Sequence, residues 1–168
     1  MKICEEQPSD IEKIWEVHSD AFETEAEANL VNSLRNSGCI YISLVAKTKN
    51  DVVGHIFFTP VELTGDVNQL KIMGLAPMAV SKKYQNKGIG SELVKTGLEH
   101  CQSLGYDAVV VIGHPNYYPR FGFVPSFKYG IKSEYDVPDE AFMVIELAPN
   151  SLQGHKGIIK YHEEFSKI

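Results

Sequence analysis

The residue pattern best suited to hold an anion is a short glycine-rich stretch, Gln85-Asn86-Lys87-Gly88-Ile89-Gly90. Apolar residues recur at helical spacing directly after it, so we expect a helix to begin there. A helix N-terminus carries backbone N–H groups without intrahelical partners and a partial positive charge, and both favour a bound phosphate. Lys82, Lys83 and Lys87 add positive charge to a chain whose formal net charge is -6. The pattern indicates a diphosphate-binding turn, but it would equally suit a turn that only joins a strand to a helix.

Two common phosphate-binding motifs do not match this stretch. The Walker A motif needs Gly-Lys-Ser/Thr at the start of the helix, and the dinucleotide motif needs a third small residue in the helix that follows. Here Gly88 and Gly90 are followed by Ser91, Glu92 and Leu93. ATP and NAD are therefore not the expected ligands.

A second polar segment, residues 113–123, follows a run of buried-strand character at 108–112. Loops that follow buried strands often carry binding and catalytic residues. Asn116 is a candidate to orient a cofactor or substrate here, and it would equally suit a simple turn. A thiol nucleophile made from Cys101 and His114 is not expected, because Cys101 falls on the apolar face of a helix, where thiols are usually inert.

Composition limits the class of protein. At 168 residues, 43% of them hydrophobic, the chain is expected to form a single domain over residues 1–168. Its negative charge argues against nucleic acid as a partner. No segment reads as a signal peptide or approaches the roughly 20 apolar residues of a membrane span, so a cytoplasmic protein is expected. Three separated cysteines and six histidines without ligand spacing predict reduced thiols and no bound metal.

Periodicity predicts a mixed α/β fold. Helical spacing predicts helices over about 9–21, from Glu27 to Asn36 and over about 88–103, and Ser9 with Glu12 is expected to form a capping box. β-Branched and aromatic runs predict strands at 40–46, 52–59, 70–80, 108–112 and 141–147, with turns at 49–51 and 65–68. The pattern over residues 70–112 therefore predicts, in this order, a strand, a glycine-rich turn, a helix and a second strand.

These motifs resemble those of the GNAT superfamily of acetyltransferases. Gln85-x-x-Gly88-x-Gly90, after the strand ending in Met78-Ala79-Val80, is similar to its Gln/Arg-x-x-Gly-x-Gly/Ala motif. Asn116, Tyr118, Gly122 and Phe123 are similar to a later motif, and the stretches 54–58, 74–80 and 113–123 resemble bacterial acetyltransferases of the YhbS type. The resemblance covers nearly the whole chain. It implies a mixed, mostly antiparallel sheet flanked by helices, with a β-α-β unit that binds acetyl-CoA.

The resemblance also implies roles for individual residues. Backbone amides of the turn would hold the CoA pyrophosphate, and the strand before it would pair with the pantetheine arm beside a gap in the sheet. An N–H group of Ala79 or Val80 would hold the oxyanion. Tyr118 would protonate the departing thiolate, with Tyr117 as the alternative. The cofactor-binding residues expected on this basis are Met78, Ala79, Val80, Gln85, Asn86, Lys87, Gly88, Ile89, Gly90, Ser91 and Asn116.

The activity implied is N-acetylation: direct transfer from acetyl-CoA to a primary amine of a small molecule or protein, in a ternary complex. A non-catalytic acyl-CoA-binding sensor of the same fold and an unrelated phosphate-binding protein remain as alternatives. The strand at 74–80 contains no acid to serve as base, so Glu25, Glu62, His55, a water chain or an amine bound in its free form would have to replace it.

Two further expectations concern partners. By analogy with the family, the acceptor is expected beside the first two helices, where acidic residues suit a cationic amine. The residues concerned are Phe22, Glu23, Glu25 and Glu27. The β character of residues 157–161 would allow this segment to pair with another strand, which leaves a homodimer open.

Overall fold

The structure, a computed structural model, describes residues 1–49, 51–66 and 69–168. It divides into two compact units, and each is described by itself. The first comprises Met1–Thr59, Ala76–Gly97 and Glu163–Ile168, and the second comprises Pro60–Leu75 and Leu98–His162. The turns predicted at 49–51 and 65–68 each include residues outside the described ranges. No helix in the described part of the chain is long and apolar enough to cross a membrane.

The first unit is built on strands in the order β1-β2-β3-β4. Strands β1 (Lys2–Glu5), β2 (Ile42–Thr48) and β3 (Asp51–Thr64) pair antiparallel, and β4 (Ile72–Val80) follows beside β3. Side chains on a strand point alternately to the two faces of the sheet. Residues 52–59 of β3 are buried on both faces, which explains their nearly continuous apolar sequence.

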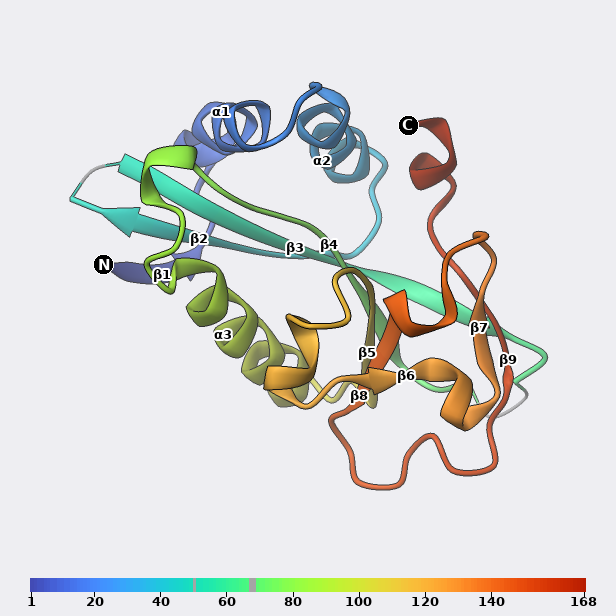
Figure 1. Ribbon diagram of the computed structural model, residues 1–168. Helices are drawn as coiled ribbons and strands as arrows, with labels where there is room; N and C mark the ends of the chain where they lie inside the picture. The colour runs from blue at the N-terminus through green and yellow to red at the C-terminus, as the bar shows by residue number, and fades with distance from the viewer. Residues whose placement is uncertain (50, 67–68) are drawn as a thin grey trace. The chain divides into compact units, whose positions relative to one another are not determined.

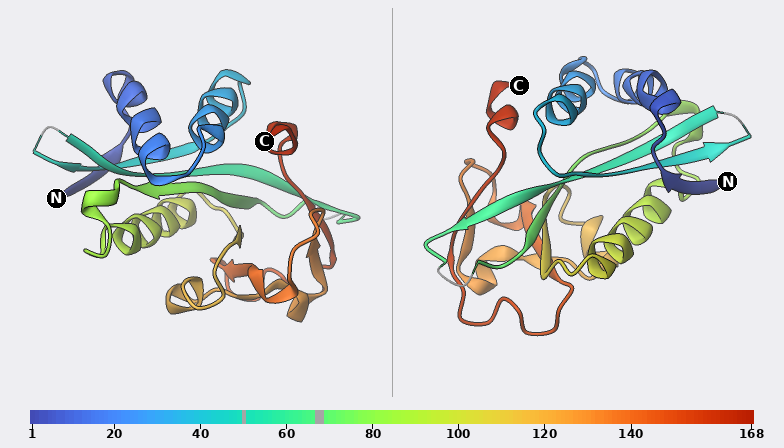
Figure 2. Two further views of the ribbon diagram at one scale, coloured as in Figure 1. Left: turned by 45° about the horizontal axis from the view of Figure 1, so that its top comes forward. Right: turned by 180° about the vertical axis from the view of Figure 1, so that it is seen from behind.

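Helices cover both faces of this sheet (Figure 1). Helices α1 (Ile11–Ala21) and α2 (Ala26–Asn36) lie on one face, and the first part of α3 (Ile89–Ser103) lies on the other, as the views in Figure 2 also show. On the α1–α2 face, the core is a cluster of buried apolar residues that includes Val17, Leu34, Phe57 and Ala79. On the other face, Gly97 allows α3 to approach the ring of Phe58.

The start of the first helix corrects one prediction. The capping box expected from Ser9 and Glu12 is wrong, because Gln7 and Asp10 form it instead, two residues earlier. The Gln7 N–H group donates to Asp10 Oδ2 at 2.8 Å, and a 3-10 turn, Pro8–Asp10, precedes α1. Asp10 is 3% exposed and forms an ion pair with Lys47 at 3.0 Å, whereas Ser9 is exposed. The ion pair with Lys47 of β2 thus holds the Asp10 carboxylate in its buried position.

The second unit contains the first part of β4 and strands β5 (Ala108–Ile112), β8 (Phe142–Glu146) and β6 (Val124–Pro125), in that order. Strand β5 pairs parallel with β4 and antiparallel with β8. Strand β9 (Gly157–Lys160) pairs antiparallel with the end of β3 and parallel with β7 (Ile131–Ser133). The β character of residues 157–161 is thus used within the chain. A mixed, mostly antiparallel sheet flanked by helices, as predicted, is confirmed.

Candidate active site

The glycine-rich turn connects β4 to α3 within the first unit. A 3-10 turn, Lys82–Tyr84, follows β4, and Asn86 and Gly88 then adopt φ angles of 62° and 84°. Glycine enters this left-handed region at little cost, and asparagine tolerates it. The side chain of Gln85 supports the turn, because its Nε2 donates to the carbonyl oxygen of Val80 at 2.9 Å.

The start of α3 presents backbone donors that the helix does not use. Its first helical hydrogen bond runs from the Glu92 N–H group to the Gly88 carbonyl oxygen at 3.1 Å. The N–H groups of Ile89, Gly90 and Ser91 therefore precede the helical ladder. Gly88 is exposed, and a Cβ atom placed on it would meet nothing within 4 Å. The turn is thus open at the point where an anion would approach these donors.

Three exposed lysines surround the turn and give it a local positive charge. The Nζ atoms of Lys83 and Lys87 lie 5.3 Å and 5.6 Å from the centroid of the Tyr84 ring, a cation–π arrangement that holds both ammonium groups nearby. The backbone N–H group of Lys82 donates to Asp20 Oδ2 of α1 at 2.7 Å. Open donors beside concentrated positive charge fit a diphosphate group.

The surroundings of β4 change along its length. In the second unit, residues 72–74 pair with β5, and this ladder ends at Gly74 and Val110. In the first unit, residues 76–80 form the outermost strand of the order β1-β2-β3-β4. Within that unit, one edge of β4 is therefore left without a partner strand.

Backbone directions show which groups of β4 lie on this edge. The Ser81 N–H group donates to the Val53 carbonyl oxygen of β3 at 2.9 Å, and a Cβ on Gly54 would lie 3.4 Å from the Ala79 carbonyl oxygen. Because backbone groups alternate along a strand, Met78 and Val80 direct theirs to the open edge. The Ala79 N–H group, one of the two expected to hold the oxyanion, therefore faces β3, and that alternative is wrong.

Tyr118 lies in the second unit at the start of a 3-10 turn, Tyr118–Phe121, with its side chain 8% exposed. Its ring packs edge-on against Tyr117 and Phe123, with centroid distances of 5.0 Å and 5.6 Å. Gly113 leaves the space that this ring occupies, because a Cβ there would collide with Tyr118 Cε2. Burial, with a smaller contribution from Tyr117, raises the pKa of Tyr118 to about 12. At neutral pH the hydroxyl is protonated and can act as a donor.

The other candidates occupy different environments. Asn116 is exposed in the loop of the second unit, and Glu25 and Glu62 are exposed as well. Cys101 is fully buried, and burial raises the pKa of its thiol to about 12, as expected for an inert thiol. Within the described ranges, no three His, Cys, Asp or Glu side chains are grouped so that they could hold a metal ion.

Comparison with known proteins shows the family. The acetyltransferase (GNAT) family matches residues 4–123, and the chain is 37% identical to the uncharacterized N-acetyltransferase YhbS of Escherichia coli K12, with both chains covered completely. This chain belongs to the GNAT family. The GNAT resemblance that the two motifs indicated is thereby confirmed.

A second sequence relative and two solved structures are also similar to this chain, and the structures confirm the fold. The uncharacterized N-acetyltransferase YjhQ of Escherichia coli K12 is 39% identical over 155 residues, covering 88% of this chain and 86% of that protein. The crystal structure of Escherichia coli YhbS in complex with CoA has a TM-score of 0.93 at 37% identity, and the two chains are covered to 98% and 91%. A GNAT acetyltransferase from Brucella melitensis in complex with acetyl-CoA has a TM-score of 0.80 at 29% identity, with 98% and 97% covered.

The expected site residues of this GNAT protein fall into the two units. The first unit brings the strand residues Met78, Ala79 and Val80 next to the turn at residues 85–91. Tyr118 and Asn116 belong to the second unit.

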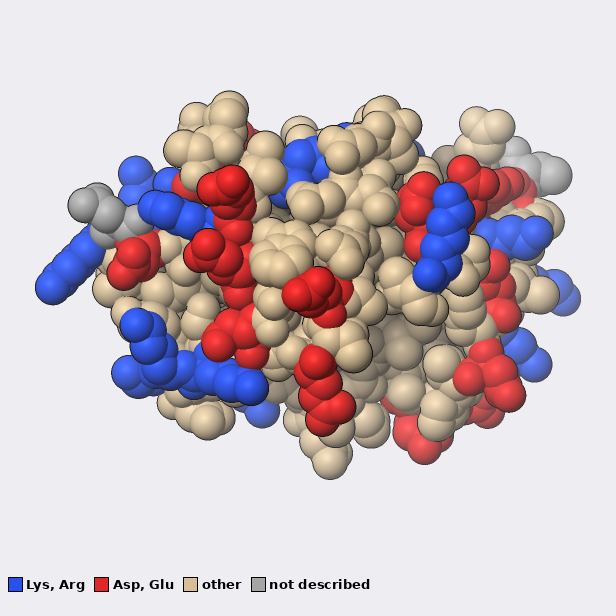
Figure 3. Space-filling model, turned by 90° about the horizontal axis from the view of Figure 1, so that it is seen from above, with Lys and Arg blue, Asp and Glu red and all other residues tan. Residues whose placement is uncertain are grey.

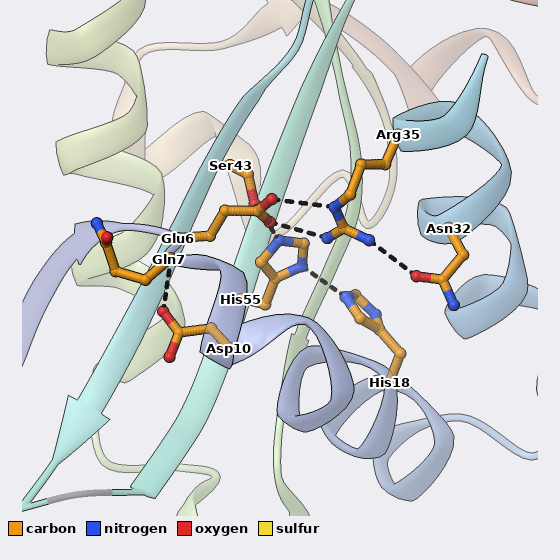
Figure 4. A network of polar contacts seen from close by, with 8 residues as sticks. All are labelled: Glu6, Gln7, Asp10, His18, Asn32, Arg35, Ser43 and His55. Atoms are coloured by element: carbon orange, nitrogen blue, oxygen red, sulfur yellow. Dashed lines mark hydrogen bonds and ion pairs between the residues drawn. The ribbon is translucent and has the colours of Figure 1, made fainter. Parts of the chain in front are cut away.

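A buried polar network in the first unit was not predicted from the sequence, apart from His55 as a candidate base. It links His18, His55, Ser43, Glu6 and Arg35 on the α1–α2 face of the sheet (Figure 4). Burial, helped by the charge of Arg35, lowers the pKa of His18 to about 4. Burial also lowers the pKa of His55 well below its usual value. One signal was present: both histidines occupy inward positions of apolar elements, and buried polar groups need partners.

Proposed function

We propose that this GNAT protein transfers an acetyl group from acetyl-CoA to a primary amine of a small molecule or protein, within a ternary complex. One observation carries the proposal: the open N–H groups of Ile89, Gly90 and Ser91 lie in the same unit as the unpartnered edge of β4. The complexes of the Escherichia coli and Brucella melitensis relatives support CoA as the ligand.

The turn and strand divide the binding of acetyl-CoA between them. The diphosphate receives hydrogen bonds from the N–H groups at the start of α3, strengthened by the helix dipole and the lysines. The amides of the pantetheine arm pair with the open edge of β4, as a short added strand would. The residues assigned to this site are Met78, Ala79, Val80, Gln85, Asn86, Lys87, Gly88, Ile89, Gly90 and Ser91, with Asn116 from the second unit.

Acyl transfer to an amine develops negative charge first on the carbonyl oxygen and then on the departing sulfur. A preorganised backbone N–H group at the open edge, from Val80 or Met78, stabilises the oxyanion by about 3 kcal/mol. Full proton transfer from Tyr118, with a pKa of about 12, to a thiolate whose conjugate acid has a pKa of about 8.5 is unfavourable. Tyr118 therefore acts as a hydrogen-bond donor that strengthens as charge grows on sulfur.

The acceptor is assigned to the α1–α2 face of the first unit. Glu12, Glu16, Asp20, Glu23 and Glu25 are exposed on α1 and the segment after it. Figure 3 looks onto this face and shows acidic side chains gathered over the region of α1 and α2. Negative charge attracts a protonated amine and raises its local concentration. The proposed acceptor is accordingly cationic before it reacts.

Calorimetry tests the binding step. Acetyl-CoA and CoA are expected to bind and ATP is not. Lys87→Ala is expected to weaken acetyl-CoA binding about 1.5- to 5-fold, since an exposed charge contact contributes about 0.2 to 1 kcal/mol. The matched control is Lys95→Ala, an exposed lysine further along α3 that should leave affinity unchanged. If titration of the wild-type protein with acetyl-CoA gives no heat of binding, the proposal is overturned.

A second measurement separates an enzyme from an acyl-CoA sensor. Release of free thiol is followed while a panel of primary amines is added to the protein with acetyl-CoA. Release that depends on the amine supports acetyl transfer. Binding without release for every amine in the panel would instead identify the chain as a binding module of the same fold.

A further inference from the structure

The buried network is a continuous chain of short hydrogen bonds that links three elements of the first unit, α1, β3 and β2, to the residue after β1. His18 Nε2 of α1 lies 2.7 Å from His55 Nδ1 of β3, and His55 Nε2 lies 2.7 Å from Ser43 Oγ of β2. Ser43 Oγ donates to Glu6 Oε1, which follows β1, at 2.5 Å. Figure 4 shows these side chains in succession, with one ring nitrogen of His18 directed at the ring of His55.

The carboxylate at one end fixes where every proton lies. Arg35 forms a two-point ion pair with Glu6, donating from Nε at 3.0 Å and from Nη2 at 2.8 Å, so Glu6 is an acceptor. The Ser43 hydroxyl group donates its hydrogen bond to Glu6, so its oxygen must accept a hydrogen bond from His55 Nε2–H. A neutral His55 then has a bare Nδ1, which accepts from His18 Nε2. A neutral His18 is left with a bare Nδ1.

That last nitrogen is the open end of the chain. His18 and His55 are both 0% exposed, and among the described residues His18 Nδ1 has no hydrogen-bond partner. A network that served packing alone would be expected to satisfy its buried atoms. Here one end is held by an ion pair and the other presents a basic lone pair to the protein interior. That lone pair is an unused proton acceptor.

We propose that the chain His18–His55–Ser43–Glu6 is the proton relay that deprotonates the acceptor amine, and this rests on the proposed function. The amine nitrogen gives its proton to His18 Nδ1, directly or through one water. His18 Nε2–H passes its proton to His55 Nδ1, His55 Nε2–H passes its proton to Ser43 Oγ, and Ser43 passes its own to Glu6. The amine loses one positive charge, Glu6 loses one negative charge, and both histidines remain neutral in their other tautomer.

A relay suits these histidines better than a single base would. Burial beside Arg35 disfavours a positive charge on either ring, so neither could hold the proton as an imidazolium. If both rings change tautomer together, the proton moves along the chain and neither ring becomes positively charged. The facing charged groups are Arg35 on α2 and Glu6 after β1, and Asn32 Oδ1 holds Arg35 through Nη1 at 2.8 Å. Glu6 is 11% exposed, which gives the proton an exit to solvent.

The location of the relay agrees with this role. His55 packs against Phe57 with centroids 5.7 Å apart, and Phe57 shares a core cluster with Ala79 of β4. The relay therefore lies on the α1–α2 face of strands β3 and β4. The open edge of β4 is the edge that we assign to acetyl-CoA. The ring of half-buried Phe22 stacks on His18 within 3° of parallel, and Phe22 begins the exposed acidic segment after α1.

The first test needs no acceptor. Long-range proton–nitrogen NMR spectra of the wild-type chain, labelled with ¹⁵N histidine, report which ring nitrogen carries the proton. At pH 7 we expect both His18 and His55 to be neutral with the proton on Nε2. A proton on Nδ1 of His18 would overturn the proposal, because the open end would then be a donor.

The second test breaks the relay in its middle. Ser43→Ala is expected to lower kcat at pH 7 about 100- to 10,000-fold in the amine-panel assay without changing acetyl-CoA affinity, consistent with the usual contribution of proton transfer. Its rate should recover as pH rises, because more of the amine then arrives deprotonated. Ser43→Thr keeps the hydroxyl and should restore the wild-type pH profile.

A matched control separates relay from packing. Thr59 is fully buried on β3, and its hydroxyl has no partner among the described residues. Thr59→Val removes this hydroxyl and should leave kcat and the pH profile unchanged. If the wild type turns over and Ser43→Ala matches it in kcat and pH profile, the relay is wrong while acetyl transfer stands. If the wild type binds acetyl-CoA but never releases thiol, both proposals fail.

Discussion

At the scale of single residues, the hydroxyl of Tyr118 is the group whose loss should separate chemistry from binding. Tyr118→Phe keeps the ring that fills the space beside Gly113 and removes only the donor. We expect kcat to fall about 10- to 100-fold, because the departing sulfur loses a hydrogen bond to a charged group. The acetyl-CoA dissociation constant, measured by calorimetry, should not change.

Tyr117 provides the matched control for this substitution. It adjoins Tyr118 and its ring packs edge-on against it, so Tyr117→Phe alters the same loop by the same atom. Turnover should stay within about twofold of wild type. Loss of turnover in Tyr117→Phe alone would show that the wrong tyrosine has been assigned.

The site residues differ in how far sequence could predict them. The turn at residues 85–90 was predictable because its function depends on neighbours in the chain: a strand end, two glycines and a helix start. The network around His55 was not, because Glu6, Ser43 and His55 come together only through pairing of β1, β2 and β3. Sequence alone named His55 as one candidate base and could not indicate its partners.

At the scale of elements, close packing of α3 on β3 depends on Gly97. A Cβ at this position would lie 2.5 Å from Phe58 Cε1 and Cζ. Glycine to alanine in a helix interior normally stabilises by roughly 1 kcal/mol. Here we expect Gly97→Ala to destabilise by about 1 to 3 kcal/mol, because overpacking outweighs helix propensity. Urea unfolding followed by circular dichroism measures the change.

Phe58→Leu supplies the compensating change for that experiment. Replacing the ring by a smaller branched side chain leaves space for the added methyl group. The double variant Gly97→Ala with Phe58→Leu should therefore be less destabilised than the sum of the two single variants. Simple additivity would contradict the proposed contact as the cause.

Helices and strands were predicted correctly where the residue pattern lies within a single segment of the chain. The helices agree closely with the helical periodicity, and the strand Ala108–Ile112 agrees with its run of β-branched residues. Strand β3 was predicted to end at residue 59, yet it continues through Pro60 to Thr64, where β9 pairs with it. Strands β1, β6 and β7 span two to four residues and went unpredicted, because runs so short show no alternation. Their formation depends on partners distant in sequence.

At the scale of the whole molecule, the buried histidines connect folding to pH. In the folded chain the pKa of His18 is about 4 instead of 6.5, chiefly because burial disfavours its charged form. His55 shifts in the same direction for the same reason. Between the folded and unfolded pKa values of His18, the unfolded chain binds more protons than the folded one. The free energy of unfolding therefore rises with pH in this interval. The stabilising effect is complete above about pH 6.5 and declines as pH falls toward 4.

Acid unfolding should therefore reveal the histidine pair. From His18 alone, a shift of about 2.5 units corresponds to roughly 3 kcal/mol lost between pH 6.5 and 4. We expect urea unfolding at several pH values to give a steep slope for the wild type and a shallower one for His18→Gln, whatever its stability at pH 7. His114→Gln replaces an exposed histidine and should keep the wild-type slope. Equal slopes for His18→Gln and wild type would mean that His18 is not held neutral, and the proton positions assigned to the relay would lose their foundation.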